Sequence, residues 1–106
     1  MRRDRKQYHI LVIEDNEGDF VMVDDLLAET ILAPVITHAP NFKIAKEILG
    51  HGDADYDVIL LDITLSDKSG KELIEETLQL ASAMPVIVNV SFPVKPILFA
   101  VSPFLY

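Results

Sequence analysis

Four short apolar runs alternate with segments of helical periodicity along the chain. The runs cover residues 8–13, 34–38, 57–61 and 85–90; the first and third lack polar alternation, which is typical of parallel strands covered on both faces. Apolar residues recur at helical spacing in residues 18–30, 42–49 and 71–80. This order predicts an α/β fold with right-handed crossovers, built on a doubly wound parallel sheet.

The expected helices have recognisable ends and apolar faces. Asn41 is a plausible N-cap for the second helix, and Gly50 is its expected stop. The residues of the first helix that we expect to face the core are Phe20, Met22, Val23, Leu26, Leu27 and Ile31.

Length and charge limit the classes of protein that fit. The 106 residues suffice for one domain, and seventeen acidic against nine basic residues give a formal net charge of −8. This charge disfavours direct binding to nucleic acids and to anionic membranes, and favours basic partners. We expect residues 1–7 to be a basic leader, interrupted by Asp4, and residues 8–106 to form a single domain.

The chain contains no cysteine, which excludes a disulfide framework, a zinc–thiolate site and a thiol nucleophile. No signal peptide is visible at the charged N-terminus. The most apolar stretch, residues 84–106, is interrupted by prolines and by Lys95, so we do not expect it to span a membrane. These features predict a cytoplasmic protein.

Two of the expected strands run directly into carboxylates. Glu14 and Asp15 follow the first strand, and Asp62 follows the third. If both strands belong to one parallel sheet, the three acids meet at one edge, where like charges would raise at least one pKa unless a cation binds. Mg²⁺ prefers such oxygen ligands, and a carboxylate can attack phosphorus to form an aspartyl phosphate. Asp62, the lone acid on its strand, is the candidate nucleophile.

A simpler interpretation is that these acids only favour helix and turn formation. Asp15, Asn16, Glu17 and Asp19 would then cap the first helix and lie at its positive end, while Asp62 would begin a turn. The presence of both acidic sites on strands predicted to be neighbours makes this interpretation the weaker one. The histidines His9, His38 and His51 are dispersed, and we expect them to lie outside the acidic edge.

Three blocks of sequence resemble the receiver domain of two-component response regulators. They are Ile-Leu-Val-Ile-Glu-Asp-Asn-Glu-Gly-Asp at 10–19, Asp-Val-Ile-Leu-Leu-Asp-Ile-Thr-Leu-Ser-Asp-Lys-Ser-Gly at 57–70 and Pro-Val-Ile-Val at 85–88. The resemblance implies the flavodoxin-like strand order 2-1-3-4-5, in which the first and third strands are neighbours. It also implies that Asp62 accepts a phosphoryl group, that Glu14 and Asp15 bind Mg²⁺ with Asp62, and that the backbone carbonyl of Thr64 completes the protein ligands. The donor would be a histidine on a kinase or phosphotransfer protein.

The last part of the chain, residues 91–106, is atypical of this family. Receivers place a Ser or Thr hydroxyl at the end of the fourth strand, but that position falls on Val90, and Ser91 would need a bulge to replace it. Lys95 and Pro96 resemble the family's Lys-Pro dipeptide, yet they follow Val90 too closely for a helical crossover to a parallel fifth strand. We therefore identify no catalytic lysine.

Two arrangements of this tail remain open. Residues 92–106 weakly resemble the fourth helix and fifth strand of receivers, which would place Lys95 on a helix surface and Phe104 at the position of the switch aromatic. Alternatively, residues 97–101 form a short antiparallel strand that folds back on the fourth. Such a tail could arise from a truncation, a deletion, a shifted reading frame or an altered functional surface. Its apolar residues, if exposed, would favour self-association, so a homodimer is one expectation.

Three functions follow from these observations. The leading hypothesis is a Mg²⁺-dependent phosphoacceptor of a two-component phosphorelay, a signalling domain rather than an enzyme, that assists its own phosphorylation on Asp62. The second is a degenerate receiver that binds proteins without a phospho-switch. The third is a phosphatase resembling the haloacid dehalogenases, which carry Asp-x-Asp after the first strand; Asp15, Asn16 and Glu17 imitate that motif only weakly.

Overall fold

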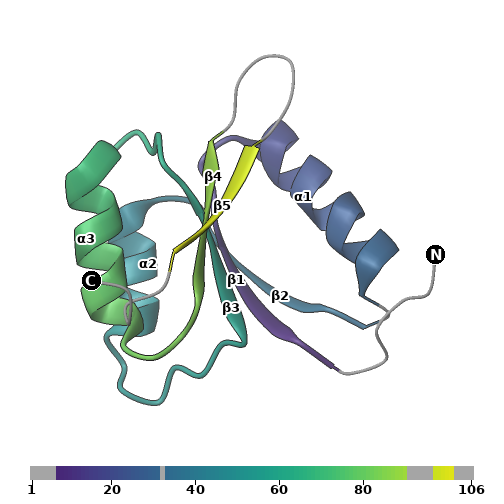
Figure 1. Cartoon of the computed structure of the whole chain (residues 1–106), viewed down its shortest axis with the longest axis horizontal. Coiled ribbons are helices and arrows are strands. Elements are labelled where there is room, and N and C mark those ends of the chain that lie inside the picture. Colours follow the sequence, from purple (N-terminus) through teal and green to yellow (C-terminus); the bar gives the residue numbers. More distant parts are fainter. Residues whose placement is uncertain (1–6, 32, 91–96, 102–106) are drawn as a thin grey trace.

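The computed structural model describes residues 7–31, 33–90 and 97–101. The elements, in chain order, are β1 (His9–Ile13), α1 (Glu17–Thr30), β2 (Val35–Ala39), α2 (Phe42–Leu49), β3 (Val58–Asp62), α3 (Gly70–Ala81), β4 (Val86–Val90) and β5 (Ile97–Val101) (Figure 1). The first four strands and the three helices lie within one residue of their expected bounds. The basic leader falls almost entirely outside the described residues.

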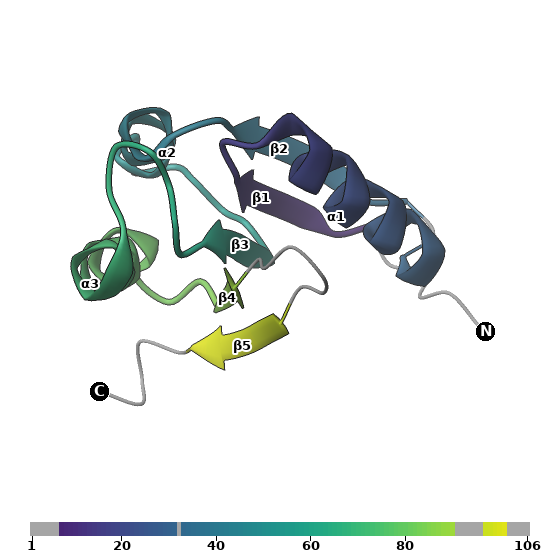
Figure 2. The ribbon, with the colours of Figure 1, turned by 90° about the horizontal axis from the view of Figure 1, so that it is seen from above.

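The five strands form one sheet in the order β2-β1-β3-β4-β5. The pairs β1–β2, β1–β3 and β3–β4 are parallel, which confirms the expected doubly wound sheet with its 2-1-3-4 order. Figures 1 and 2 show α2 and α3 on one face of the sheet and α1 on the other. Because these three pairs are all parallel, the carboxyl ends of the four strands lie at the same edge of the sheet.

The larger of the two cores lies between the sheet and the α2–α3 layer. It is built from alternate strand residues such as Leu11, Ile13 and Leu61, which are fully buried. As expected, Asn41 caps α2: its side chain accepts a 2.8 Å hydrogen bond from the Ile44 N–H, and α2 ends before Gly50. The helix buries Phe42, Ala45 and Leu49 in this core.

The smaller core, beneath α1, corrects part of the sequence prediction. Phe20, Val23 and Leu27 pack on the sheet as expected, but Met22 and Leu26 point away from it and are 57% and 48% exposed. A helix turns about 100° per residue, so positions 22 and 26 lie off the stripe formed by 20, 23, 27 and 31. The apolar residues of α1 therefore exceed what its contact with the sheet can bury.

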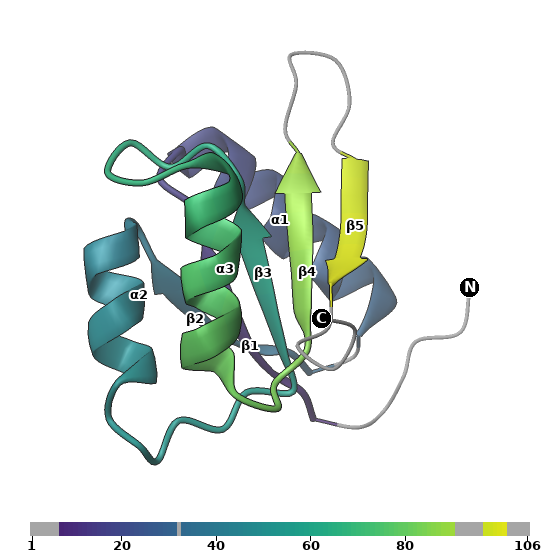
Figure 3. The same ribbon diagram turned by 60° about the vertical axis from the view of Figure 1, so that its left-hand side comes forward.

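The fifth strand runs antiparallel to the fourth (Figure 3). Val90 pairs with Ile97 and Val86 pairs with Val101, so residues 97–101 form the fold-back strand rather than part of a fourth helix. Residues 91–96 are too few for the crossover that a parallel strand would need, which is the physical reason for this direction. Ser91, Lys95 and Phe104 lie outside the described residues, so their expected roles stay predictions.

Within the described ranges, no helix is both long and apolar enough to cross a membrane.

Candidate functional site

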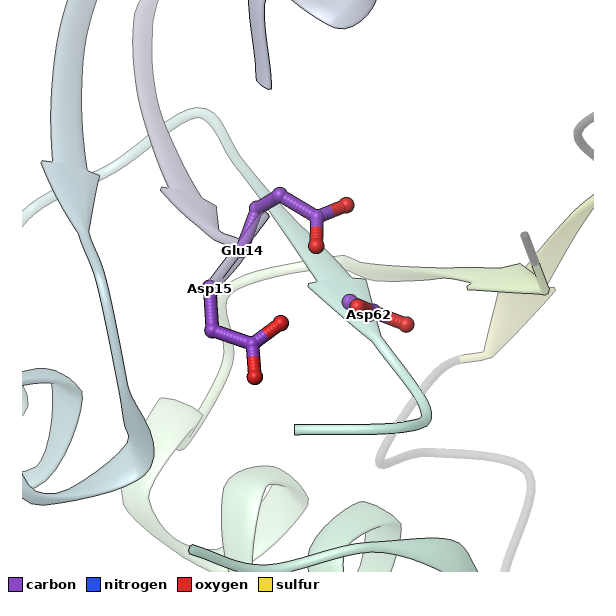
Figure 4. Close-up of side chains that lie close together, drawn as sticks. All are labelled: Glu14, Asp15 and Asp62. Carbon is purple, nitrogen blue, oxygen red and sulfur yellow. The ribbon is translucent and has the colours of Figure 1, made fainter. Parts of the chain in front are cut away.

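The three acids meet at the carboxyl edge of the sheet. Ile13 of β1 is the register partner of Leu61 in β3, so Glu14 and Asp15 emerge beside Asp62. One carboxylate oxygen from each residue lies within 4.8 Å of the other two. Figure 4 shows the three side chains gathered at this edge. The parallel pairing of two strands thus brings together acids that lie almost fifty residues apart in the chain.

Glu14 is the most buried member of the cluster, with 1% of its surface exposed. Burial and the neighbouring Asp62 carboxylate raise the pKa of Glu14 to about 8, against a smaller lowering effect of the Asn16 N–H, which donates to Oε2 at 3.3 Å. The other oxygen, Oε1, is buried and has no hydrogen-bond partner. A buried carboxylate oxygen of this kind is costly unless a proton or a cation satisfies it.

Asp62 is also buried, and one of its oxygens is fixed by the next turn of the chain. Its Oδ1 accepts hydrogen bonds from the N–H and from the hydroxyl of Thr64, both at 3.0 Å. A hydrogen bond between the carboxyl groups of Glu14 and Asp62 is among the causes that raise the pKa of Glu14. Thr64 therefore orients the Asp62 carboxylate through Oδ1.

Asp15 links the end of β1 to the loop between β3 and α3. Its Oδ2 accepts a 2.8 Å hydrogen bond from the Ser66 N–H. The helix α1 is capped by Asn16 instead, whose side chain accepts from the Asp19 N–H at 2.9 Å. Helix capping thus accounts for Asn16 and for the first-turn acids Glu17 and Asp19, as the simpler interpretation expects, but not for Asp15.

The loop after Asp62 is anchored at its other end by Asp67, a residue that the sequence did not single out. The two oxygens of Asp67 accept 3.0 Å hydrogen bonds from the N–H groups of Phe42 and Lys43, the first two residues of α2. These bonds hold the pKa of the Asp67 carboxyl below its usual range, with the bond from Phe42 as the largest cause. Only the fold brings residue 67 to this helix end, so no local pattern could have revealed the contact.

A short network of side chains continues from this loop to α3. Lys68 forms an ion pair with Glu76, and its ammonium also lies 5.3 Å from the centre of the Phe42 ring. Glu76 in turn pairs with Lys46 of α2 at 3.3 Å. The loop 63–69 is therefore held between the acidic cluster on one side and the α2–α3 layer on the other.

His38 lies outside the acidic cluster, as expected, but its ring contacts the backbone beside that cluster. Its Nε2 is 2.7 Å from the backbone oxygen of Glu14, and its ring stacks on Phe20 with 3.8 Å between centroids. The cause is the register of β2 with β1, in which Ile13 pairs with Ala39. His38 contacts the backbone and is not one of the acidic cluster, so its observed role is structural.

The arrangement fits a hard divalent cation. Three carboxylates converge, one buried oxygen lacks a partner, and the ammonium groups of Lys46, Lys68 and Lys71 pair with glutamates of α3 instead. Mg²⁺ takes carboxylate oxygens together with water and phosphate oxygens, which a cluster at an open sheet edge can supply. Glu17 begins α1 and is not part of the cluster, so the Asp-x-Asp arrangement of the phosphatase hypothesis does not form.

Comparison with solved structures shows which known fold this is. The chain is similar to the phosphorylated cyanobacterial phytochrome response regulator RcpA, with 26% sequence identity and a TM-score of 0.66. The similarity covers 78% of this chain and 64% of that chain. No protein-family model matches the sequence, and no curated protein does. The protein has the receiver fold of response regulators.

The structure departs from the receiver pattern at the ends of β4 and β5. Asn89 is the register partner of Asp62 on β4, and Val90 follows it, so neither residue type offers the expected hydroxyl. The antiparallel β5 ends at Val101, which pairs with Val86 at the far end of β4. β5 therefore ends at the edge of the sheet opposite to Asp62.

Proposed function

We propose that this receiver domain accepts a phosphoryl group on Asp62 in a two-component phosphorelay. The donor would be a phosphohistidine on a histidine kinase or a phosphotransfer protein, and the domain would act in the cytoplasm as a signalling unit that assists its own phosphorylation. The observation that carries the proposal is the position of Asp62, whose carboxylate lies with those of Glu14 and Asp15 at the carboxyl edge of a receiver sheet. The solved neighbour is itself described as phosphorylated, which supports the same chemistry.

The residues that would hold Mg²⁺ are Glu14, Asp15, Asp62 and the backbone carbonyl of Thr64. When bound, the ion would offset negative charge on the transferred phosphoryl oxygens. Binding of the ion would change the protonation of Glu14 most. Burial favours the protonated form of this carboxyl, whereas a bound cation favours the ionised form. The unpartnered Oε1 of Glu14 supports this assignment.

Asp62 would supply the nucleophile. The Thr64 N–H and hydroxyl hold Oδ1, so the attack falls to Oδ2, which forms the bond to phosphorus as the phosphorus–nitrogen bond of phosphohistidine breaks. The electron pair of the broken bond remains on the imidazole nitrogen, which takes up a proton. Asp15 would position the loop through Ser66, so that the neighbouring Thr64 keeps its contacts with Asp62.

A second candidate is a degenerate receiver that binds partners without a phospho-switch. Two observations favour it. The residue of β4 that pairs with Asp62 is Asn89, which has no hydroxyl, and the antiparallel β5 ends at the edge of the sheet opposite to the site. Such a protein would bind Mg²⁺, but Asp62 would be phosphorylated poorly, or its phosphorylation would not cause a conformational change.

Incubation with Mg²⁺ and acetyl phosphate, followed by intact mass measurement, separates these functions. A single phosphoryl adduct that is absent from Asp62→Asn and from a sample with chelator supports the phosphoacceptor. Tight Mg²⁺ binding without an adduct supports the degenerate module. Sustained release of phosphate from a phosphoester would instead support a phosphatase.

A further inference from the structure

The loop between β3 and α3 connects parts of the fold that lie far apart in the sequence. Thr64 donates to Asp62 from its N–H and from its hydroxyl, each at 3.0 Å. The Ser66 N–H donates to Asp15 at 2.8 Å, and the neighbouring Asp67 carboxylate accepts from the first turn of α2. One loop therefore contacts two acids of the cluster and the beginning of a helix.

The shape of this loop is fixed between these contacts. Thr64 forms an isolated antiparallel bridge with Ser69, and the Gly70 N–H donates to the Ile63 oxygen at 3.0 Å, so the loop is closed at its base. The side chain of Leu65 is 4% exposed and lies in the larger core. Side chains in a close-packed core leave little room for a shift. A displacement at one end of the loop should therefore be transmitted to the other end.

The contact with α2 consists of two backbone N–H groups. The first N–H groups of a helix have no partner within the helix. Those of Phe42 and Lys43 donate to the two oxygens of Asp67, each at 3.0 Å. The next N–H, that of Ile44, donates to the side chain of Asn41. Asp67 thus satisfies two N–H groups of α2 and holds the loop against a helix end whose first residue, Phe42, is 6% exposed.

We propose that loop 63–69 couples the acidic cluster to the first turn of α2, with Asp67 as the positioning residue. Asp67 holds the loop against α2, and the loop in turn orients the carboxylates of Asp15 and Asp62. The effect of this coupling on Mg²⁺ rests on the proposed function. Because coupling is reciprocal, the factor that the Asp67 contact adds to cation affinity is also the factor by which the cation stabilises that contact. A partner that displaced Asp67 from α2 would therefore weaken the cation site.

Hydrogen exchange of the full chain labelled with ¹⁵N tests the coupling in the presence of chelator. Asp15→Ala should speed exchange of the Phe42 and Lys43 amides about fivefold, although the bond that it removes is to Ser66. Asp15→Asn keeps an oxygen that can accept this bond and should restore slow exchange. The control Asp25→Ala, at an exposed acid of α1, should leave these amides unchanged.

Two outcomes of this comparison would overturn the proposal. One is unchanged exchange of the Phe42 and Lys43 amides in Asp15→Ala. The other is an equal acceleration in the middle of α3, which would mean that the substitution destabilises the whole fold rather than the loop contact.

Calorimetric titration with Mg²⁺ tests the role of Asp67. Asp67→Ala should weaken Mg²⁺ binding about fivefold, at the low end of couplings between sites. Asp67→Asn removes the same charge but keeps an oxygen acceptor, and should weaken binding less than about twofold. Asp53→Ala, which removes an exposed charge from another loop, should leave the affinity unchanged. Equal losses in the alanine and asparagine variants of Asp67 would assign the effect to charge alone and contradict a positioning role.

Exchange of the unaltered chain with Mg²⁺ separates this proposal from the proposed function. Saturating Mg²⁺ should slow exchange of the Phe42 and Lys43 amides by about the factor that Asp67→Ala costs in affinity. Mg²⁺ binding that leaves these amides unchanged would support the cation site and contradict the coupling. If the chain does not bind Mg²⁺, the proposed cation site is wrong, and the comparison in chelator still decides whether the loop couples the cluster to α2.

Discussion

Asp15 accepts a 2.8 Å hydrogen bond from the backbone N–H of Ser66, although 51 residues separate them in the chain. The bond joins the segment after β1 to the segment after β3, the two parts of the sequence that supply the acidic cluster. Asp15 therefore holds the loop that carries Thr64, in addition to the role of cation ligand that we propose for it.

Replacing Asp15 with alanine should weaken Mg²⁺ binding by at least about tenfold, because one of the converging carboxylates is lost. The same change should speed hydrogen exchange at the Ser66 amide. Calorimetric titration measures the affinity, and Asp25→Ala, an exposed acid of α1 outside the cluster, is the matched control. If both variants bind Mg²⁺ as the unaltered chain does, Asp15 is not a ligand.

The raised pKa of Glu14 predicts a pH-dependent stability in the absence of metal. Between about 4.5, the ordinary value, and about 8, the folded protein keeps a proton that the unfolded chain releases. The free energy of unfolding therefore falls as pH rises through this window, by at most about 1.4 kcal/mol per pH unit for one group. Saturating Mg²⁺ should reduce the slope, because it stabilises the ionised carboxylate of the folded state.

Urea unfolding at several pH values, with chelator and with Mg²⁺, measures this dependence. Glu14→Gln cannot ionise and should show a flatter profile between pH 5 and pH 8. If the unfolding free energy of Glu14→Gln falls with pH as steeply as that of the unaltered protein, groups other than Glu14 cause the pH dependence.

Asp67 is predicted to stabilise the α2 end of the fold. Asp67→Ala removes the acceptor for the N–H groups of Phe42 and Lys43, and should cost about 1 kcal/mol of unfolding free energy, as the loss of a helix cap does. The exchange of these two amides should accelerate. Asp53→Ala, at an exposed acid of another loop, should change stability by less than about 0.5 kcal/mol. Equal effects of the two substitutions would show that the cap is not formed in solution.

Substitution of two leucines tests the difference in burial between Leu61 of β3 and Leu26 of α1. Leu61 is fully buried in β3, so Leu61→Ala should lower the free energy of unfolding by about 2–5 kcal/mol. Leu26 of α1 is 48% exposed, and Leu26→Ala should cost less than about 1 kcal/mol because little packing is lost. Denaturant unfolding compares the two variants directly. A large loss at Leu26 would mean that this part of α1 is covered.

The sequence predicted the order and type of the main elements because their signals are local. Unalternated runs such as those before Glu14 and Asp62 indicate buried parallel strands. The meeting of their acids also requires that the two strands be neighbours, which the resemblance to receivers implies and the sheet confirms. Asn41 was recognisable as a cap because a cap depends on the three residues that follow it.

The features that were missed depend on contacts between distant segments or on small angular differences. Asp67 reaches α2 and His38 reaches the Glu14 backbone only through the register of the sheet and the path of a loop. Leu26 looked like a core residue because it neighbours Leu27, yet one position turns a helical side chain by about 100°.

We expect Asp62 to carry the phosphoryl group as an acyl phosphate. After treatment with acetyl phosphate and Mg²⁺, borohydride reduces an aspartyl phosphate to homoserine, which tandem mass spectrometry locates in a peptide. We predict homoserine at position 62 alone, absent when a chelator replaces Mg²⁺. Homoserine at another aspartate, a glutamate reduced to its side-chain alcohol, or a phosphate that survives on a hydroxyl residue would contradict this assignment.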